Sequence, residues 1–355
     1  MIPPFTYAPL AARVLFGPGR SAEIGAEVAA LGARRALVLS TRDQAGMAAR
    51  VAAPLGDALA AAFDGAAMHT PVEVTGRALA LLREARCDAL VAVGGGSTVG
   101  LGKALALRTG LPQVAVPTTY AGSEVTPILG QTEDGLKTTI RSPGVLPEVV
   151  IYDPDLTLTL PPALSAASDL NAVAHAIEAL YAHDANPITS LMAEEGIRAL
   201  AGALPRVVAD PDCRAARAEA QYGAWLCGTC LGAVGMALHH KLCHVLGGAF
   251  DLPHAETHAA VLPHAAAYNA PAAPGALSRA ARALGGLDAG AALWALSARL
   301  GAPRALRDLG MPEEGIPRAV ALALEGAYPN PRTPDAASLA ALLRRAWAGE
   351  PPAAD

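Results

Sequence analysis

Histidines at helical spacing are the residues best suited to do chemistry in this chain. His240 and His244 are four residues apart, so they share one face of a helix. The same spacing relates Asn171 to His175, and His254 follows in an Asp-Leu-Pro-His segment at a loop or helix start. Imidazoles in this pattern either bind a metal ion or donate hydrogen bonds and protons to a substrate. The spacing leaves both roles open.

Other polar residues near these histidines have weaker claims to a site. His258 is a further candidate member. Lys103 and Lys241 are candidate cations for an anionic ligand, although a solvated helix residue is the simpler interpretation of Lys241. His239 and His264 are interpreted as structural, because a histidine on an apolar helix is usually a core residue. The candidate site therefore depends mainly on the helically spaced histidines.

A glycine-rich segment, AVGGGSTVGLGK, is the second feature with chemical meaning. In it Gly94, Gly95, Gly96 and Ser97 follow a predicted strand and open a predicted helix. Glycines let the backbone approach an anion closely, and a helix N-terminus offers free N–H groups and a positive dipole end. The spacing matches neither a GxGxxG fingerprint nor a Walker loop. The agreement of position and composition favours a phosphate-binding loop over a turn without a ligand.

Hydroxyl side chains follow the next predicted strand, residues 113–116. Thr118, Thr119 and Ser123 could line the crevice at the carboxyl ends of the strands, where open α/β sheets bind ligands. Capping of their own loop is an equally good interpretation of each hydroxyl.

The elements that must position these residues fall into two groups. The first half alternates buried strand patterns at 35–40, 89–93 and 113–116 with helical stretches at 21–31 and 75–86. This alternation predicts a parallel sheet covered by helices. Asp134-Gly135 lies between two strand-like runs within 128–140 and predicts a tight hairpin.

The pattern changes after the strand-like run 149–153 (VVIYD). Helical periodicity continues from residue 165 to residue 347, with predicted helices at 165–182, 187–203, 212–234 and 235–247. The sequence therefore predicts a Rossmann-like α/β domain over residues 1–160 and an all-α domain over residues 161–355.

Composition excludes several classes of protein. The 355 residues are 52% hydrophobic and 17% charged, so disorder is not expected. A net charge of −5 without basic runs argues against nucleic acid as a partner. No signal-peptide pattern is recognised, and apolar runs are interrupted before they could cross a bilayer. An odd number of cysteines, five, suits a reducing cytoplasm.

The chain resembles the iron-containing alcohol dehydrogenase superfamily and, within it, the maleylacetate reductases. The resemblance covers nearly the whole chain and depends on several motifs in order: VAVGGGSTVGLGK, VPTTYAGSEVT, DLNAVAHAIEALYA, HHKLCHVLGGAFDLPHAETHA and VLPHAAAYN. It implies a dinucleotide-binding α/β domain followed by a helical catalytic domain. It also implies that the segment Gly94–Ser97 holds the cofactor pyrophosphate, with Thr118 and Thr119 near the nucleotide.

One departure from the family pattern concerns the metal. Metal-dependent members place an aspartate and three histidines around the ion, and the matching positions here are Asn171, His175, His244 and His254. A neutral amide thus replaces a carboxylate, which weakens the binding of a divalent cation. Asp169 lies two residues before Asn171 on a different helix face and is not expected to substitute. We therefore expect no metal, as the resemblance to the metal-independent maleylacetate reductases also implies.

The resemblance implies reduction of maleylacetate, an unsaturated keto-dicarboxylate, to 3-oxoadipate in aromatic compound degradation. Hydride would add to the alkene carbon β to the ketone, and the resulting enolate would need hydrogen-bond donors and a proton. The expected donors are His175, His244 and His254, with His240 or His258 assisting. Lys241 is a weak candidate for holding a substrate carboxylate.

The cofactor is expected to be NADH or NADPH. The turn after the second strand of this kind of fold often carries an acidic residue that binds the ribose, but here it carries Thr41 and Arg42. We therefore expect both cofactors to be accepted. The resemblance also implies a homodimer, in which the segment 12–16 pairs either across subunits or at the edge of its own sheet.

Three alternatives remain open. A metal-dependent alcohol dehydrogenase could tolerate asparagine as a ligand. A lyase similar to 3-dehydroquinate synthase would need more basic residues near the histidines than the sequence offers. A nucleotide-binding sensor without catalytic activity would not need the histidine cluster.

Overall fold

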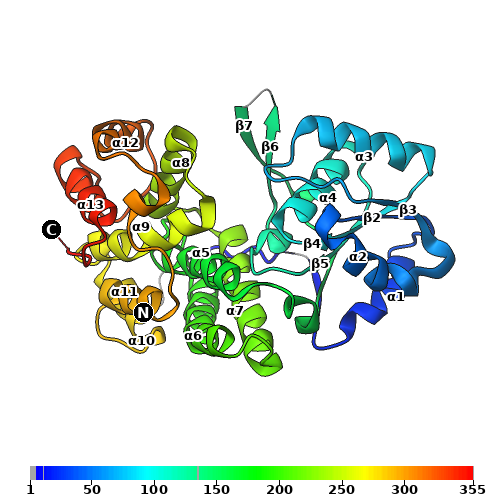
Figure 1. Cartoon of the computed structure of the whole chain (residues 1–355), viewed down its shortest axis with the longest axis horizontal. Coiled ribbons are helices and arrows are strands. Elements are labelled where there is room, and N and C mark those ends of the chain that lie inside the picture. Colours follow the sequence, from blue (N-terminus) through cyan, green and yellow to red (C-terminus); the bar gives the residue numbers. More distant parts are fainter. Residues whose placement is uncertain (1–4, 11, 134–135, 355) are drawn as a thin grey trace. The chain divides into compact units, whose positions relative to one another are not determined.

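The computed structural model describes residues 5–10, 12–133 and 136–354 (Figure 1). The described chain divides into two compact units at Leu160. Residues 9–160 form the first, which we call the sheet unit, and residues 161–354 with residues 5–8 form the second, the helical unit. The sequence-based boundaries placed residues 5–8 with the sheet unit. These residues form no helix or strand, so no periodic pattern indicated where they pack.

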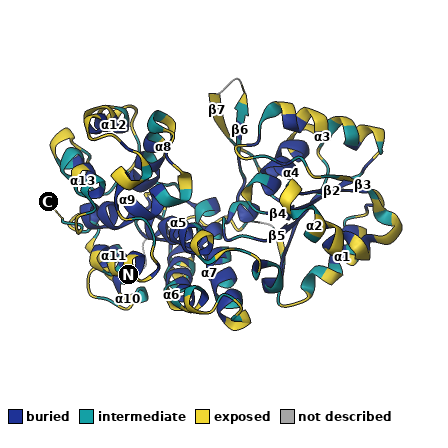
Figure 2. Ribbon diagram, viewed as in Figure 1, coloured by how far each residue is buried: buried dark blue, intermediate teal, exposed yellow. Residues whose placement is uncertain are grey.

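The sheet unit is built on a six-stranded parallel sheet with the strand order β1-β8-β5-β4-β2-β3. Its central strands are buried along their whole length, as Figure 2 shows, because helices cover both faces. The strands are β1 (Arg13–Phe16), β2 (Ala36–Leu39), β3 (Leu59–Phe63), β4 (Ala89–Gly94), β5 (Gln113–Pro117) and β8 (Val149–Tyr152).

Alternating side chains of β2 point to opposite faces of this sheet. Val38 packs in one apolar cluster with Val51 of α2, whereas Leu39 packs in another with Leu82 of α3 and Leu101 of α4. The predicted parallel α/β architecture is therefore confirmed. The covering helices are α1 (Ile24–Ala30), α2 (Ala45–Ala52), α3 (Val72–Glu84) and α4 (Gly96–Thr109).

Two features of this unit differ from what the sequence patterns indicate. Strand β3, with the sequence LAAAF, was not predicted, because alanine favours helices; pairing with β2 holds it extended. The predicted hairpin has its two strands, β6 (Ile128–Glu133) and β7 (Leu136–Arg141), paired antiparallel with Glu133 opposite Leu136. The turn residues Asp134 and Gly135 lie outside the described residues.

The helical unit contains nine α-helices within its described residues. Helix α8 begins at Leu238, three residues later than the periodicity predicts, because Gly235 and Ala237 instead donate their N–H groups to the carboxylates of Asp184 and Glu178. No described helix has both the length and the apolar character needed to cross a membrane. The helices are α5 (Pro162–Tyr181), α6 (Pro187–Ala209), α7 (Arg214–Ala233), α8 (Leu238–Phe250), α9 (His254–Asn269), α10 (Pro274–Ala283), α11 (Ala289–Arg299), α12 (Ile316–Leu324) and α13 (Ala336–Ala348).

Candidate active site

The glycine-rich segment forms a tight connection from β4 to α4 in the sheet unit. Gly94 has φ 152°, and a Cβ on it would lie 2.5 Å from the Thr98 Oγ1. A Cβ on Gly95, the N-cap of α4, would lie 2.8 Å from the Thr119 Cγ2. Glycine is therefore required at both positions, and α4 starts with its first N–H groups directed out of the turn.

The loops after β2, β4 and β5 come together at the carboxyl edge of the sheet. The Gln44 side-chain amide donates to the Thr118 Oγ1 at 2.8 Å, and the Thr118 N–H donates to the Gly94 carbonyl at 3.2 Å. Thr41 begins the same short 3-10 turn that carries Gln44, whose N–H donates to the Thr41 carbonyl. Strand β3 lies on one side of β2, and the next strand in the chain, β4, lies on its other side. The strand order therefore reverses between β2 and β4, and open α/β sheets bind ligands at such a point.

Lys103 does not face an anionic ligand, contrary to the sequence-based suggestion. Its side chain is fully buried, and its ammonium donates to the carbonyls of Ser123 (2.5 Å), Thr126 (2.7 Å) and Ile128 (2.8 Å). Burial lowers the pKa of Lys103 to about 7, although nearby Glu124 opposes this change. Lys103 therefore fastens the segment after β5 to α4.

The helical unit brings six imidazoles into one cluster. Their ring centroids lie between 4.4 and 6.4 Å from the next ring in a continuous series of contacts. We call this set the histidine cluster: His175 from α5, His239, His240 and His244 from α8, and His254 and His258 from α9.

Sequence reasoning missed the carboxylate that organises this cluster, Glu178. It lies three residues after His175 on α5 and is fully buried. It accepts hydrogen bonds from the N–H groups of Ala237 (2.8 Å) and His239 (2.7 Å), and its Oε2 lies 2.7 Å from the His240 Nδ1. A carboxylate near the free N-terminus of α8 is favourable because the helix dipole is positive there. Its helical spacing from His175 was the available signal.

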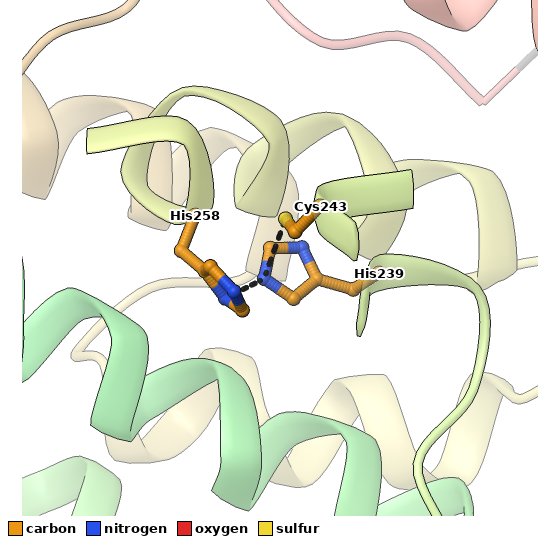
Figure 3. Close-up of side chains that lie close together, drawn as sticks. All are labelled: His239, Cys243 and His258. Atoms are coloured by element: carbon orange, nitrogen blue, oxygen red, sulfur yellow. Dashed lines mark hydrogen bonds between the residues drawn. The ribbon is translucent and has the colours of Figure 1, made fainter. Parts of the chain in front are cut away.

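His239 belongs to the cluster rather than being a remote structural residue. Its Nε2 lies 2.9 Å from the His258 Nδ1 and 3.7 Å from the Cys243 Sγ (Figure 3). His264 instead contacts Trp294, with ring centroids 5.8 Å apart. His239 is therefore a member of the cluster, whereas His264 lies apart from it and its structural role stays a prediction.

Several nitrogens of the buried imidazoles lack partners, and burial favours the neutral form of three of these rings. Burial lowers the pKa of His175, His239 and His258 well below the usual histidine value, and neighbouring imidazoles lower it further. The His175 Nδ1 and the His240 Nε2 find no hydrogen-bond partner among the described residues. The same holds for the Asn171 Oδ1 on α5. Unpaired polar atoms of this kind are costly to bury, so a substrate that pairs with them would bind favourably.

Of the four positions expected to match the family's metal ligands, His175 lies close enough to His254 for the two rings to interact electrostatically. The ring of buried His175 stacks on that of His240, with centroids 5.1 Å apart, whereas His244 stacks on His254 at 6.4 Å and both of those are exposed. Buried Asp169 interacts with Arg217 on α7, so it does not replace the missing ligand charge.

Lys241 makes its contacts outside the histidine cluster. Its ammonium donates to the Glu325 carbonyl at 2.9 Å and lies 5.9 Å from the centroid of the Tyr328 ring. Because the Lys241 ammonium already makes these two contacts, Lys241 is a weaker candidate for binding a substrate carboxylate.

Comparisons with known proteins agree with this architecture. The model of the iron-containing alcohol dehydrogenases matches residues 11–154, and the model of the C-terminal part of the Fe-containing alcohol dehydrogenase family matches residues 165–347. A maleylacetate reductase from Sphingobium indicum is 58% identical over 98% of this chain and 99% of its own length.

Solved structures give the same result. The crystal structure of maleylacetate reductase from Agrobacterium tumefaciens superposes with a TM-score of 0.97 at 56% identity, covering 99% of this chain and 100% of the other. A sulfoacetaldehyde reductase from Bifidobacterium kashiwanohense, solved in complex with NAD⁺, has a TM-score of 0.90 at 27% identity, covering 96% of this chain and 98% of the other. The resemblance drawn from the sequence motifs is confirmed, and the chain belongs to the iron-containing alcohol dehydrogenase family.

Proposed function

We propose that this oxidoreductase uses NADH or NADPH to reduce maleylacetate to 3-oxoadipate and that it needs no metal ion for the reaction. Maleylacetate reductases that are 49–58% identical over nearly the whole chain support the substrate. The histidine cluster supports the chemistry, because an unsaturated ketone that accepts hydride needs hydrogen-bond donors and one proton.

The observation that carries the proposal is the pairing of Glu178 with His240. The carboxylate holds a proton on the His240 Nδ1 at 2.7 Å, so the imidazole presents its unpartnered Nε2 in a fixed orientation. In its doubly protonated form His240 carries a second proton on this Nε2, and it is the group best placed to deliver that proton to substrate carbon.

The remaining imidazoles serve the developing enolate. Hydride arrives at the alkene carbon β to the ketone, and the electron pair moves to the ketone oxygen. His175, stacked on His240, can donate a hydrogen bond to that oxygen, and exposed His244 and His254 are placed to meet the substrate from the outer side of the cluster. The proton from His240 then completes the reduced carbon–carbon bond.

Iron, which the family name implies, fits these residues poorly. Asn171 contributes a neutral amide oxygen, and the imidazoles near it are neutral, so no ligand at the expected positions supplies negative charge. The carboxylate that contacts the histidine cluster, Glu178, is already engaged by two N–H groups and by His240. The mechanism above therefore uses no metal step.

A nicotinamide dinucleotide fits the sheet unit. The turn Gly94–Ser97 would hold the pyrophosphate at the N-terminus of α4, and Thr118, Thr119 and Ser123 would lie beside it. The buried Thr98 Oγ1 has no partner among the described residues and adds a polar group behind the turn. The cofactor supplies the hydride. The absence of an acid at Thr41 supports acceptance of both NADH and NADPH.

We place the enzyme in the cytoplasm as a homodimer. All five cysteines are free thiols, which suits a reducing compartment. Strand β1 pairs with β8 at the edge of its own sheet, and its other side offers a position where a second subunit could add.

The test is oxidation of NADH by the purified chain with freshly prepared maleylacetate, before and after exhaustive EDTA treatment. We expect activity that survives EDTA unchanged. Activity that is lost and then restored by iron or zinc would return the chain to the metal-dependent alcohol dehydrogenases. If neither state shows activity, the substrate assignment is wrong.

A further inference from the structure

We propose that His239, Cys243 and His258 form a binding site for a soft divalent cation such as Zn²⁺, separate from the position at which the family name implies iron. All three side chains are buried, and one ligand atom from each lies within 4.8 Å of the others. Figure 3 shows the two imidazoles and the thiol pointing toward one another from α8 and α9. Among the described residues, these three are the one group of histidine, cysteine or carboxylate side chains whose possible ligand atoms lie this close together.

The donor types favour zinc over harder ions. Thiolate sulfur and imidazole nitrogen are ligands of Zn²⁺, whereas Mg²⁺, Ca²⁺ and Mn²⁺ prefer oxygen. On binding, the Cys243 thiol would lose its proton to solvent, and each imidazole would bind in its neutral form. Two ligands four residues apart on one helix and a third on the next helix form a common pattern for such sites.

Two of the three distances between ligand atoms need only small changes, and the third, between the Cys243 Sγ and the His258 ring, lies within 4.8 Å and would shorten on binding. Around a tetrahedral Zn²⁺ with bonds of about 2.0 Å to nitrogen and about 2.3 Å to sulfur, ligand atoms lie roughly 3.3–3.6 Å apart. The His239 Nε2 and the Cys243 Sγ are 3.7 Å apart, and the His239 Nε2 and the His258 Nδ1 are 2.9 Å apart. The ring pair would therefore open by a few tenths of an ångström. The fourth position is open to water or to the nearby unpartnered His240 Nε2.

An ion at this site would interfere with the proposed reaction. It would occupy the His258 Nδ1 and fix a ring whose centroid lies 5.0 Å from that of His240 and 4.4 Å from that of His254. We therefore expect Zn²⁺ to inhibit the reductase. Inhibition depends on the proposed function, whereas binding of the ion does not.

The experiment is a titration of the metal-free chain with Co²⁺, followed by displacement with Zn²⁺. We expect one equivalent of Co²⁺ to give a sulfur-to-cobalt charge-transfer band together with the intense visible bands of a four-coordinate ion. The band identifies the site, because Cys243 is the cysteine whose thiol contacts the histidine cluster, at the His239 Nε2. Cys243→Ser should lose the band, and His258→Gln should weaken binding at least tenfold.

Two controls separate this site from its neighbours. Cys213→Ser removes a partly exposed thiol at the start of α7 and should keep the band. His175→Gln alters the position matched to the family's metal and should also keep it. Thermal unfolding confirms that each variant is folded. Cobalt binding without the charge-transfer band, or a band that persists in Cys243→Ser, would overturn the proposal whether or not the chain reduces maleylacetate.

Discussion

In the sheet unit the buried Lys103 ammonium contacts four oxygens, whereas in the helical unit the Asn171 Oδ1, the His175 Nδ1 and the His240 Nε2 have no partner among the described residues. Each unpaired buried polar atom costs about 1–3 kcal/mol. The sheet unit therefore uses its buried polar groups to fix a loop, and the helical unit keeps some of its own available. Catalytic chemistry is expected where polar groups remain unsatisfied.

Glu178 is the group beside these unpaired atoms whose own hydrogen bonds are satisfied, and replacing it tests the comparison most strongly. In Glu178→Gln, the side-chain NH₂ would face N–H groups that donate to the carboxylate in the wild type. His240 would also lose its fixed orientation and its negative neighbour. We expect kcat to fall by about 10²- to 10⁴-fold, the usual contribution of general acid–base catalysis, with a smaller change in KM. Steady-state kinetics over a range of pH measures both.

Glu195→Gln is the matched control. Glu195 lies on α6, is paired with Arg198 at 2.7 Å, and is partly exposed. This variant should keep wild-type kcat. A Glu178→Gln enzyme that is folded and fully active would remove Glu178 as a positioning residue and leave the cluster without its organising charge.

The opposite arrangement, a buried charged group whose hydrogen bonds are all satisfied, is tested at Lys103. Lys103→Met leaves three backbone carbonyls without their donor, so the free energy of unfolding should fall by roughly 3 kcal/mol. Because the pKa of Lys103 is lowered to about 7 in the folded chain, the unfolded chain holds the extra proton above that pH. Wild-type stability should therefore increase from about pH 7 to about pH 10.5, the ordinary lysine value.

Denaturant unfolding followed by circular dichroism at a series of pH values measures this effect. The difference between wild type and Lys103→Met isolates the contribution of Lys103 from other titrating groups. A difference that does not change with pH would mean that Lys103 keeps its proton in the folded chain.

The glycine turn Gly94–Ser97 is the next test, because a positive φ and close packing both restrict Gly94. Gly94→Ala introduces a side chain at φ 152° and against the Thr98 Oγ1, which should destabilise the chain by about 2–4 kcal/mol. The affinity for NADH should fall with it, as fluorescence titration would show. Gly76→Ala in α3, where nothing lies within 4 Å, should instead stabilise by about 0.5–1 kcal/mol. Tight NADH binding by Gly94→Ala would argue against the turn as the pyrophosphate site.

The sequence predicted the elements better than the contacts between them. Apolar runs such as 89–93 and helical spacing such as that of Asn171 and His175 are local patterns, and the structure contains both. The role of Glu178 depends on N–H groups about 60 residues later in the chain, so no local pattern shows it. For the same reason, the contact between His239 and His258 was missed, because it joins two helices.

The smallest expected effect concerns cofactor choice in the sheet unit. Thr41→Asp places a carboxylate in the turn after β2, where it would accept a hydrogen bond from the ribose of NADH and repel the 2′-phosphate of NADPH. The position is only half-buried, so the change should be about 1 kcal/mol, or roughly fivefold in the ratio of kcat/KM for NADH to that for NADPH. Thr41→Asn has nearly the same shape without the charge and should leave the ratio near that of wild type. The same shift in both variants would attribute the effect to shape rather than charge, and no shift in either would place the ribose away from Thr41.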